Sequence, residues 1–275
     1  MEKRVRISPA YRRQEDLLRQ RVLSASLPFE KKLSYHRTRL VSSIAKGLAE
    51  LPPIEWEGYV RDMVQEPYLQ KWFTEMYWAA GRPAGERAIR NFLNIKSDPM
   101  DSWEWALQDW LKREAGNKIV IVQGSMKKWL VDYLRLYLDE NSDLGVEQIV
   151  RNIEGDLMKQ WKDARQWQIR RIVQTESLTA MSEAADVAIK GLGIKYNKTW
   201  GISGHNTRKA HLAMDGITIG QLDLFDVGGE KMEYPRDAKY GATAANIINC
   251  RCYCIRKPLN DRGGLITDED ILGMV

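Results

Sequence analysis

The chain has 275 residues, a length that allows one large domain or two of moderate size. Hydrophobic residues make up 44% of it and ten residues are tryptophan, which excludes a disordered protein. No apolar run approaches the length of a membrane helix, and the first residues lack the apolar core of a signal peptide. The three cysteines, all near the C-terminus, suit a reducing cytosol.

The net charge of +5 is unevenly distributed along the chain. Residues 1–50 hold twelve of the 42 Lys and Arg residues and five of the 37 Asp and Glu residues, a local charge of +7, which leaves −2 for the remainder. We therefore expect a basic, partly helical N-terminal arm. Such an arm lies either in solvent or on nucleic acid, and in the second case by non-specific electrostatic contact.

Residues 51–192 have the composition of a helical body. Apolar and aromatic residues recur at helical spacing, most clearly from Met126 to Tyr137, and we expect the tryptophans to be mainly core residues. Proline and glycine predict helix breaks near Pro28 and at Gly81–Pro83. The β-branched segment Ile119–Gln123 indicates either a short strand or the buried first turn of the next helix.

A long helix closed by Gly191 and Gly193 follows. Glu176 lies on its apolar face, and a carboxylate in that position requires a partner. We expect Glu176 to pair with Arg208 or His211, unless the helix turns it toward the solvent boundary.

After residue 193 the pattern changes to short apolar segments separated by turns, which is typical of a small α+β module. Its expected elements are a strand over 194–200, a helix over 206–214, a strand over 217–219 and a last strand over 249–255. The predicted fold class is therefore α+β. A mainly helical N-terminal two-thirds precedes the module of short antiparallel strands at 193–258, and a tail follows at 259–275.

The cysteines alternate with other residues at the end of this module. On a strand, Cys250, Cys252 and Cys254 would share one face, because successive side chains point to opposite sides. Thiols two residues apart are poor disulfide partners, but two thiolates and the His211 imidazole suit a zinc ion. With Cys254 or His205 as a fourth ligand the site would be structural, and with the fourth position open it could be catalytic. The alternative is that the cysteines are reduced and simply pack in the core.

The order of short motifs in this region resembles the phage Mu F-type minor head protein (head morphogenesis) family. The likeness covers Arg165 to Pro258, about a third of the chain, and includes a Thr-Glu step at Thr175 and Glu176. Two positions depart from the family pattern, Gly204 and Asn206, where the family often has Asp and Arg. The remaining matching residues are Trp200, Thr207, Arg208, His211, Asp215, Gly216, Phe225, Gly228, Gly229, Tyr234, Pro235, Asp237, Asn249, Cys250, Arg251 and Cys252.

The resemblance implies a non-enzymatic virion protein made in the host cytoplasm. It implies association with the portal protein and with the major capsid or scaffolding protein, and effects on head morphogenesis, DNA packaging or ejection. On this interpretation a polar cluster stabilises the module through hydrogen bonds or a structural zinc. Its members are Glu176, Thr207, Arg208, His211, Asp215, Asn249 and Arg251.

An enzyme is the alternative hypothesis. In a metal-dependent hydrolase or nuclease, Glu176 would be the general base beside a metal held by the histidine and cysteines, with Asp215 nearby. In a thiol enzyme, a cysteine nucleophile would use a histidine base. The sequence lacks the H-E-x-x-H motif and a glycine-rich phosphate loop, which argues against both.

Overall fold

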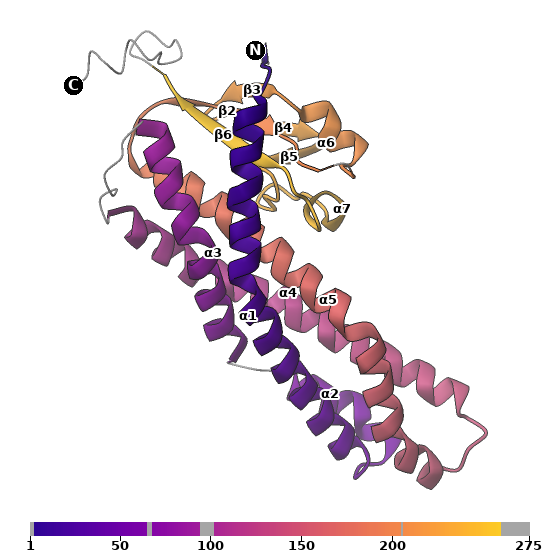
Figure 1. The fold of residues 1–275 in the computed structure, drawn as a ribbon. Coiled ribbons are helices and arrows are strands. Elements are labelled where there is room, and N and C mark those ends of the chain that lie inside the picture. The colour runs from indigo at the N-terminus through magenta and orange to yellow at the C-terminus, as the bar shows by residue number, and fades with distance from the viewer. Residues whose placement is uncertain (1–2, 65–67, 94–101, 205, 260–275) are drawn as a thin grey trace. The chain divides into compact units, whose positions relative to one another are not determined.

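The computed structural model describes residues 3–64, 68–93, 102–204 and 206–259 (Figure 1). Long helices account for most of them, and short antiparallel strands gather in the C-terminal part, which confirms the α+β class. Among these residues, none of the helices combines the length and apolarity that a membrane crossing requires. The helices are α1 (Pro9–Leu48), the 3₁₀ turn η1 (Pro53–Glu55), α2 (Trp56–Met63), α3 (Tyr68–Leu93), α4 (Ser102–Glu140), α5 (Val146–Gly191), α6 (Lys209–Met214) and α7 (Ala244–Ile247).

The chain forms two compact units. The sheet unit contains residues 1–26, 76–110 and 173–275, and the helical unit contains residues 27–75 and 111–172. These units divide the chain differently from the boundaries expected at residues 50, 192 and 258. The reason is that each unit is assembled from segments that lie far apart in the sequence.

The helical unit has an aromatic-rich core formed by apolar faces of α1, α2, α4 and α5. Trp56 and Trp161 are fully buried there, and the Trp56 indole donates to the carbonyls of Leu48 and Leu51. Trp129 packs on Trp161 with ring centroids 5.5 Å apart. The aromatic stripe that was predicted to be core is therefore core in this unit.

The helices are longer than the sequence predicted. Pro28 lies inside α1, Gly81–Pro83 lies inside α3, and Ile119–Gln123 lies inside α4, so the predicted breaks and the predicted strand are wrong. Tertiary packing outweighs local propensity at such sites. At Gly81 an added Cβ would lie 3.1 Å from the Ala184 side chain, which shows that this glycine permits close packing against α5.

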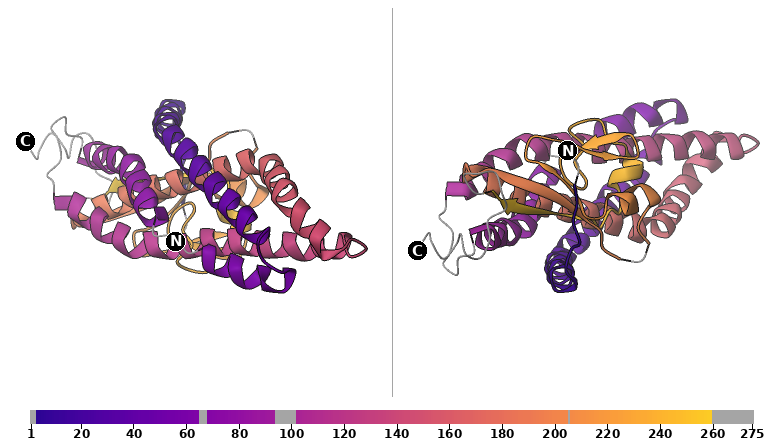
Figure 2. Two further views of the ribbon diagram at one scale, coloured as in Figure 1. Left: turned by 90° about the horizontal axis from the view of Figure 1, so that it is seen from below. Right: turned by 90° about the horizontal axis from the view of Figure 1, so that it is seen from above.

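The strands of the sheet unit form a four-stranded antiparallel sheet in the order β1-β3-β2-β6 and a separate hairpin, seen from two further sides in Figure 2. The last strand starts at Tyr253, four residues later than predicted, so Cys250 and Cys252 precede it in a loop. The strands are β1 (Lys3–Arg4), β2 (Tyr196–Gly201), β3 (Ile217–Gly220), β4 (Phe225–Val227), β5 (Glu230–Met232) and β6 (Tyr253–Pro258).

The N-terminal segment is part of this sheet unit. Strand β1 pairs with β3, and Ile7 packs on side chains of β6. Arg4 donates to a carbonyl near the end of α6, Arg12 makes two hydrogen bonds to Asp215, and Arg19 donates to the carbonyl of Arg251. Three arginines of the predicted basic arm are thus bound within the protein, because the C-terminal segment offers acceptors that the sequence pattern does not reveal.

Candidate metal site

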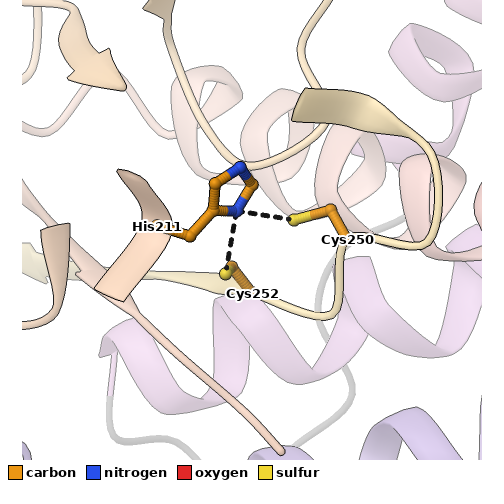
Figure 3. Close-up of side chains that lie close together, drawn as sticks. All are labelled: His211, Cys250 and Cys252. Atoms are coloured by element: carbon orange, nitrogen blue, oxygen red, sulfur yellow. Dashed lines mark hydrogen bonds between the residues drawn. The ribbon is translucent and has the colours of Figure 1, made fainter. Parts of the chain in front are cut away.

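The structure brings together one imidazole and two thiols. His211 lies on α6, and Cys250 and Cys252 lie in the loop between α7 and β6 (Figure 3). His211 Nδ1 is 3.5 Å from Cys250 Sγ and 3.4 Å from Cys252 Sγ, and the three ligand atoms all lie within 4.8 Å of one another. All three side chains are buried. The group can therefore hold a metal ion away from bulk solvent.

The distances suit a tetrahedral zinc centre. With Zn–S near 2.3 Å and Zn–N near 2.0 Å, tetrahedral geometry places nitrogen and sulfur about 3.5 Å apart. The two Nδ1–Sγ distances are 3.4 and 3.5 Å, so little movement of the side chains would be needed. Without a metal, the same distances allow thiol–imidazole hydrogen bonds.

Two neighbours fix the orientation of the histidine ring. The Asn246 side-chain amide donates to the carbonyl of Val227, which leaves its Oδ1 to accept from His211 Nε2–H at 3.1 Å. Nε2–H therefore donates to Asn246, and Nδ1 is the ring nitrogen that faces the sulfurs, as expected of a metal-binding histidine. Trp200 packs edge-on against the ring, with centroids 5.7 Å apart. No motif or spacing in the sequence points to Asn246.

Arg236 holds the cysteine loop in place. Its guanidinium is buried, and one nitrogen donates to the carbonyls of both Cys250 and Cys252 at 2.8 Å, while the other donates to Ser182 of α5. The backbone of Arg236 has φ 74°, a strained value for a non-glycine residue that these hydrogen bonds help to maintain. Nothing in the sequence pattern indicates this role, because an arginine in a Tyr-Pro-Arg-Asp turn is usually solvent-exposed.

The two thiols have different acidities. A hydrogen bond from the Cys252 thiol lowers the pKa of Cys250, and His211 and Arg236 lower it further against the effect of burial. The same hydrogen bond, together with burial, raises the pKa of Cys252. Cys250 is therefore the first of the pair to become a thiolate, the form that binds metals.

Several predicted site residues have other partners. The Glu176 carboxylate accepts a hydrogen bond from Tyr77, and Arg208 donates to the carbonyl of Ile248, so the predicted Glu176–Arg208 and Glu176–His211 pairs are wrong. Asp215 binds Arg12 and the backbone amide of residue 202. Neither carboxylate belongs to the ligand group. These partners could not be predicted, because the spacing of residues along a helix does not show which distant element packs on each of its faces.

The rest of the predicted polar cluster is structural or peripheral. Thr207 donates to backbone carbonyls in its own loop. Asn249 has φ 57°, and its backbone N–H donates to the Thr175 hydroxyl. Arg251 is exposed. Cys254 lies within β6 and is outside the ligand group, so it does not supply the predicted fourth ligand. His205, the other predicted fourth ligand, lies outside the described residues.

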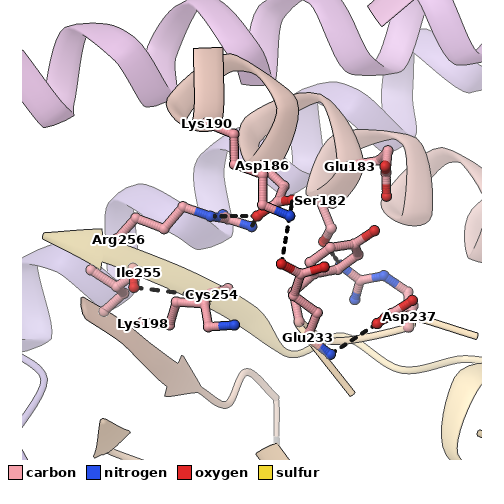
Figure 4. Close-up of polar contacts among 12 residues, drawn as sticks. Ser182, Glu183, Asp186, Lys190, Lys198, Glu233, Asp237, Cys254, Ile255 and Arg256 are labelled. Atoms are coloured by element: carbon pink, nitrogen blue, oxygen red, sulfur yellow. Dashed lines mark hydrogen bonds and ion pairs between the residues drawn. The ribbon is translucent and has the colours of Figure 1, made fainter. Parts of the chain in front are cut away.

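A second polar cluster joins α5 to the sheet (Figure 4). Asp186 is buried and binds both Arg256 of β6 and Lys190, and Lys190 also binds Glu233. Burial alone would raise the pKa of Asp186, but Arg256 and Lys190 hold it below its usual value. Burial raises the pKa of nearby Glu183 to about 7. These pairs anchor the sheet on α5, and of these residues Arg256 also lines a small cavity.

No family model matches this chain, and neither do any of the curated proteins or solved structures compared with it.

Proposed function

We propose that this protein is a bacteriophage minor head protein whose C-terminal module is stabilised by one zinc ion. Two observations support the proposal. The ordered motifs of the Mu F-type resemblance belong to one folded sheet unit, and three of their residues form the buried group of His211, Cys250 and Cys252. All three ligands are buried and the group includes no carboxylate to act as a general base, which favours a structural role for the metal over a hydrolytic one.

The zinc ion would join α6 to the loop that precedes β6. These two segments are about 40 residues apart in the chain, so one ion would restrain a long loop of the unfolded chain. Elemental analysis of the purified full-length protein by mass spectrometry tests this role. We expect about one zinc per chain and a lower melting temperature after chelation. Protein that holds no stoichiometric metal at neutral pH would overturn the zinc proposal.

In the virion, we propose low-copy incorporation at the portal vertex, through contact with the portal protein and with the major capsid or scaffolding protein. Head morphogenesis, DNA packaging and ejection are the processes that such a position would influence. Assembly would take place in the host cytoplasm. Exposed basic side chains of α1, such as Arg13 and Arg21, would be available for non-specific DNA contact.

Co-sedimentation tests the assembly role. Full-length protein at micromolar concentration and low salt is mixed with the portal protein and, separately, with the major capsid protein of the same phage. We expect it to sediment with at least one of them. If it remains in the supernatant in both mixtures, the assembly proposal is wrong whatever the result for zinc.

One geometric feature supports a second candidate, a thiol hydrolase. Cys250, His211 and Asn246 are arranged like a Cys-His-Asn triad. Cys250 Sγ lies 3.5 Å from His211 Nδ1, and His211 Nε2 lies 3.1 Å from Asn246 Oδ1. The metal-hydrolase alternative has lost its expected base, since Glu176 binds Tyr77. Alkylation of metal-free protein by iodoacetamide distinguishes the candidates. Rapid, selective labelling of Cys250 that zinc does not prevent would favour a nucleophile, and protection by one equivalent of zinc would favour the metal centre.

A further inference from the structure

A cavity of about 60 Å³ opens beside the three candidate ligands. His211, Cys250 and Cys252 form part of its wall, so the cavity lies where a metal held by these residues would have a free coordination position. The described residues that line the cavity include no aspartate or glutamate. The remaining lining residues are Ser203, Gly204, Asn206, Thr207, Arg208, Asn249 and Arg251.

Positively charged side chains lie beside the cavity. Arg208 and Arg251 line it, and Arg236 lies behind the cysteine loop, with one nitrogen 3.9 Å from Cys250 Sγ. Arg208 binds a backbone carbonyl and Arg236 binds carbonyls and a hydroxyl. Within the described part of the chain, none of the three guanidinium groups forms an ion pair with a carboxylate. Three neighbouring arginines without acidic partners are typical of a site that receives an anion from outside.

Charge balance at the centre leads to the same conclusion. Two thiolates neutralise a divalent zinc ion, and a neutral imidazole adds no charge. If the fourth ligand were neutral, Arg236 would stay buried without a compensating negative charge, which is costly. An anionic fourth ligand gives the centre a charge of about −1, which the guanidinium balances.

We propose that the fourth coordination position faces this cavity and binds an oxyanion group, either a carboxylate or a phosphate. The inference rests on the proposed zinc centre. Arg251, which is exposed, and Arg208 would contact the free oxygens of the anion. The cavity is small, about 60 Å³, so one such group is the part of a ligand that it would hold.

Cobalt substitution gives a direct readout. In full-length protein loaded with Co²⁺, the visible absorption bands report the ligands and the coordination number of the metal. The protein is titrated separately with inorganic phosphate and with acetate, at constant ionic strength. We expect a saturable spectral change with at least one of them, and the anion that binds more tightly identifies the group that the cavity prefers.

A test variant and a control variant lose the same charge at different places. Arg251→Gln should raise the apparent Kd of the anion about threefold to fivefold, the effect of losing one exposed charged contact. Arg13→Gln removes an exposed arginine of α1 that does not line the cavity, and it should leave the Kd unchanged.

The outcomes separate this inference from the zinc proposal. If the protein binds no zinc or cobalt, both are overturned. If it binds metal in a four-coordinate centre that neither anion perturbs, or if the two variants respond alike, the zinc proposal stands and the oxyanion site does not exist.

Discussion

Replacing Arg236 by methionine tests the role of the buried guanidinium. Methionine keeps much of the aliphatic stem but removes the donors to the carbonyls of Cys250 and Cys252 and to the hydroxyl of Ser182. Each buried acceptor that loses its donor costs about 1 kcal/mol net, so we expect Arg236→Met to lower the free energy of unfolding by about 3 kcal/mol. The variant also no longer has to bury a charged group, and this gain offsets part of the stability lost with the hydrogen bonds.

Urea unfolding with excess chelator measures this effect, because chelation removes any contribution from metal binding. Arg251→Met is the matched control. Arg251 is exposed, and among the described residues its side chain has no hydrogen bond or ion pair, so the control should change the free energy of unfolding by less than about 0.5 kcal/mol. If the two variants unfold at the same urea concentration with the same slope, Arg236 does not hold the loop as described.

Zinc affinity gives a second test of the role of Arg236. Residues that orient metal ligands without touching the metal typically change affinity by about tenfold to a hundredfold. We therefore expect Arg236→Met to weaken zinc binding by about that factor, and Arg236→Lys, which keeps the charge and some donors, to restore part of it. Equal zinc affinities in the wild type, Arg236→Met and Arg236→Lys would show that the guanidinium does not position the thiols.

Three further predictions follow from the described contacts. Cys252→Ser should abolish stoichiometric zinc binding and Cys254→Ser should not, as measured by elemental analysis, because only the first thiol belongs to the ligand group. Asp215→Asn should lower the free energy of unfolding by about 1 kcal/mol, less at high salt, since it removes the charge that binds Arg12 but keeps an acceptor. Burial raises the pKa of Glu183 from 4.5 to about 7, so its contribution to stability is complete below pH 4.5 and is lost as the pH rises through 7. Urea unfolding should show wild-type protein losing up to about 3 kcal/mol between pH 4.5 and 8, and Glu183→Gln should flatten this decline.

The candidate ligands could be predicted from the sequence, although strand alternation is not what brings them together. Strand alternation predicted that Cys250 and Cys252 share a face. In the structure they precede β6, and hydrogen bonds from Arg236 to their carbonyls hold them in a loop. The same alternation predicted that Cys254 joins them as a ligand. This prediction is wrong, because of the three cysteines only Cys254 lies in the strand, outside the ligand group. Residue types and spacing thus indicated the chemistry, while tertiary contacts determine which thiols converge.

Other features depend on contacts that no local pattern reveals. Glu176 on an apolar helix face did require a partner, and it accepts a hydrogen bond from Tyr77, 99 positions earlier in the chain and on a different helix. The orienting role of Asn246 depends on the separate hydrogen bond that its amide makes to the carbonyl of Val227. Helix ends were mispredicted where packing overrides propensity, as at Pro28 within α1. In each case the deciding interaction joins residues far apart in the sequence.

The N-terminal segment shows how this affects the interpretation of function. The excess of basic residues suggested an arm that lies in solvent or on nucleic acid. In the structure β1 extends the sheet beside β3, and Arg12 and Arg19 bind groups that belong to the C-terminal module. Asp186 and Ser182 of α5 attach the same module from another side. Residues 193–258 therefore obtain an edge strand and several buried partners from elsewhere in the sheet unit. A contact that displaced the N-terminal segment would consequently expose the β3 edge and unpair Asp215, so binding at this surface and the stability of the module are physically coupled.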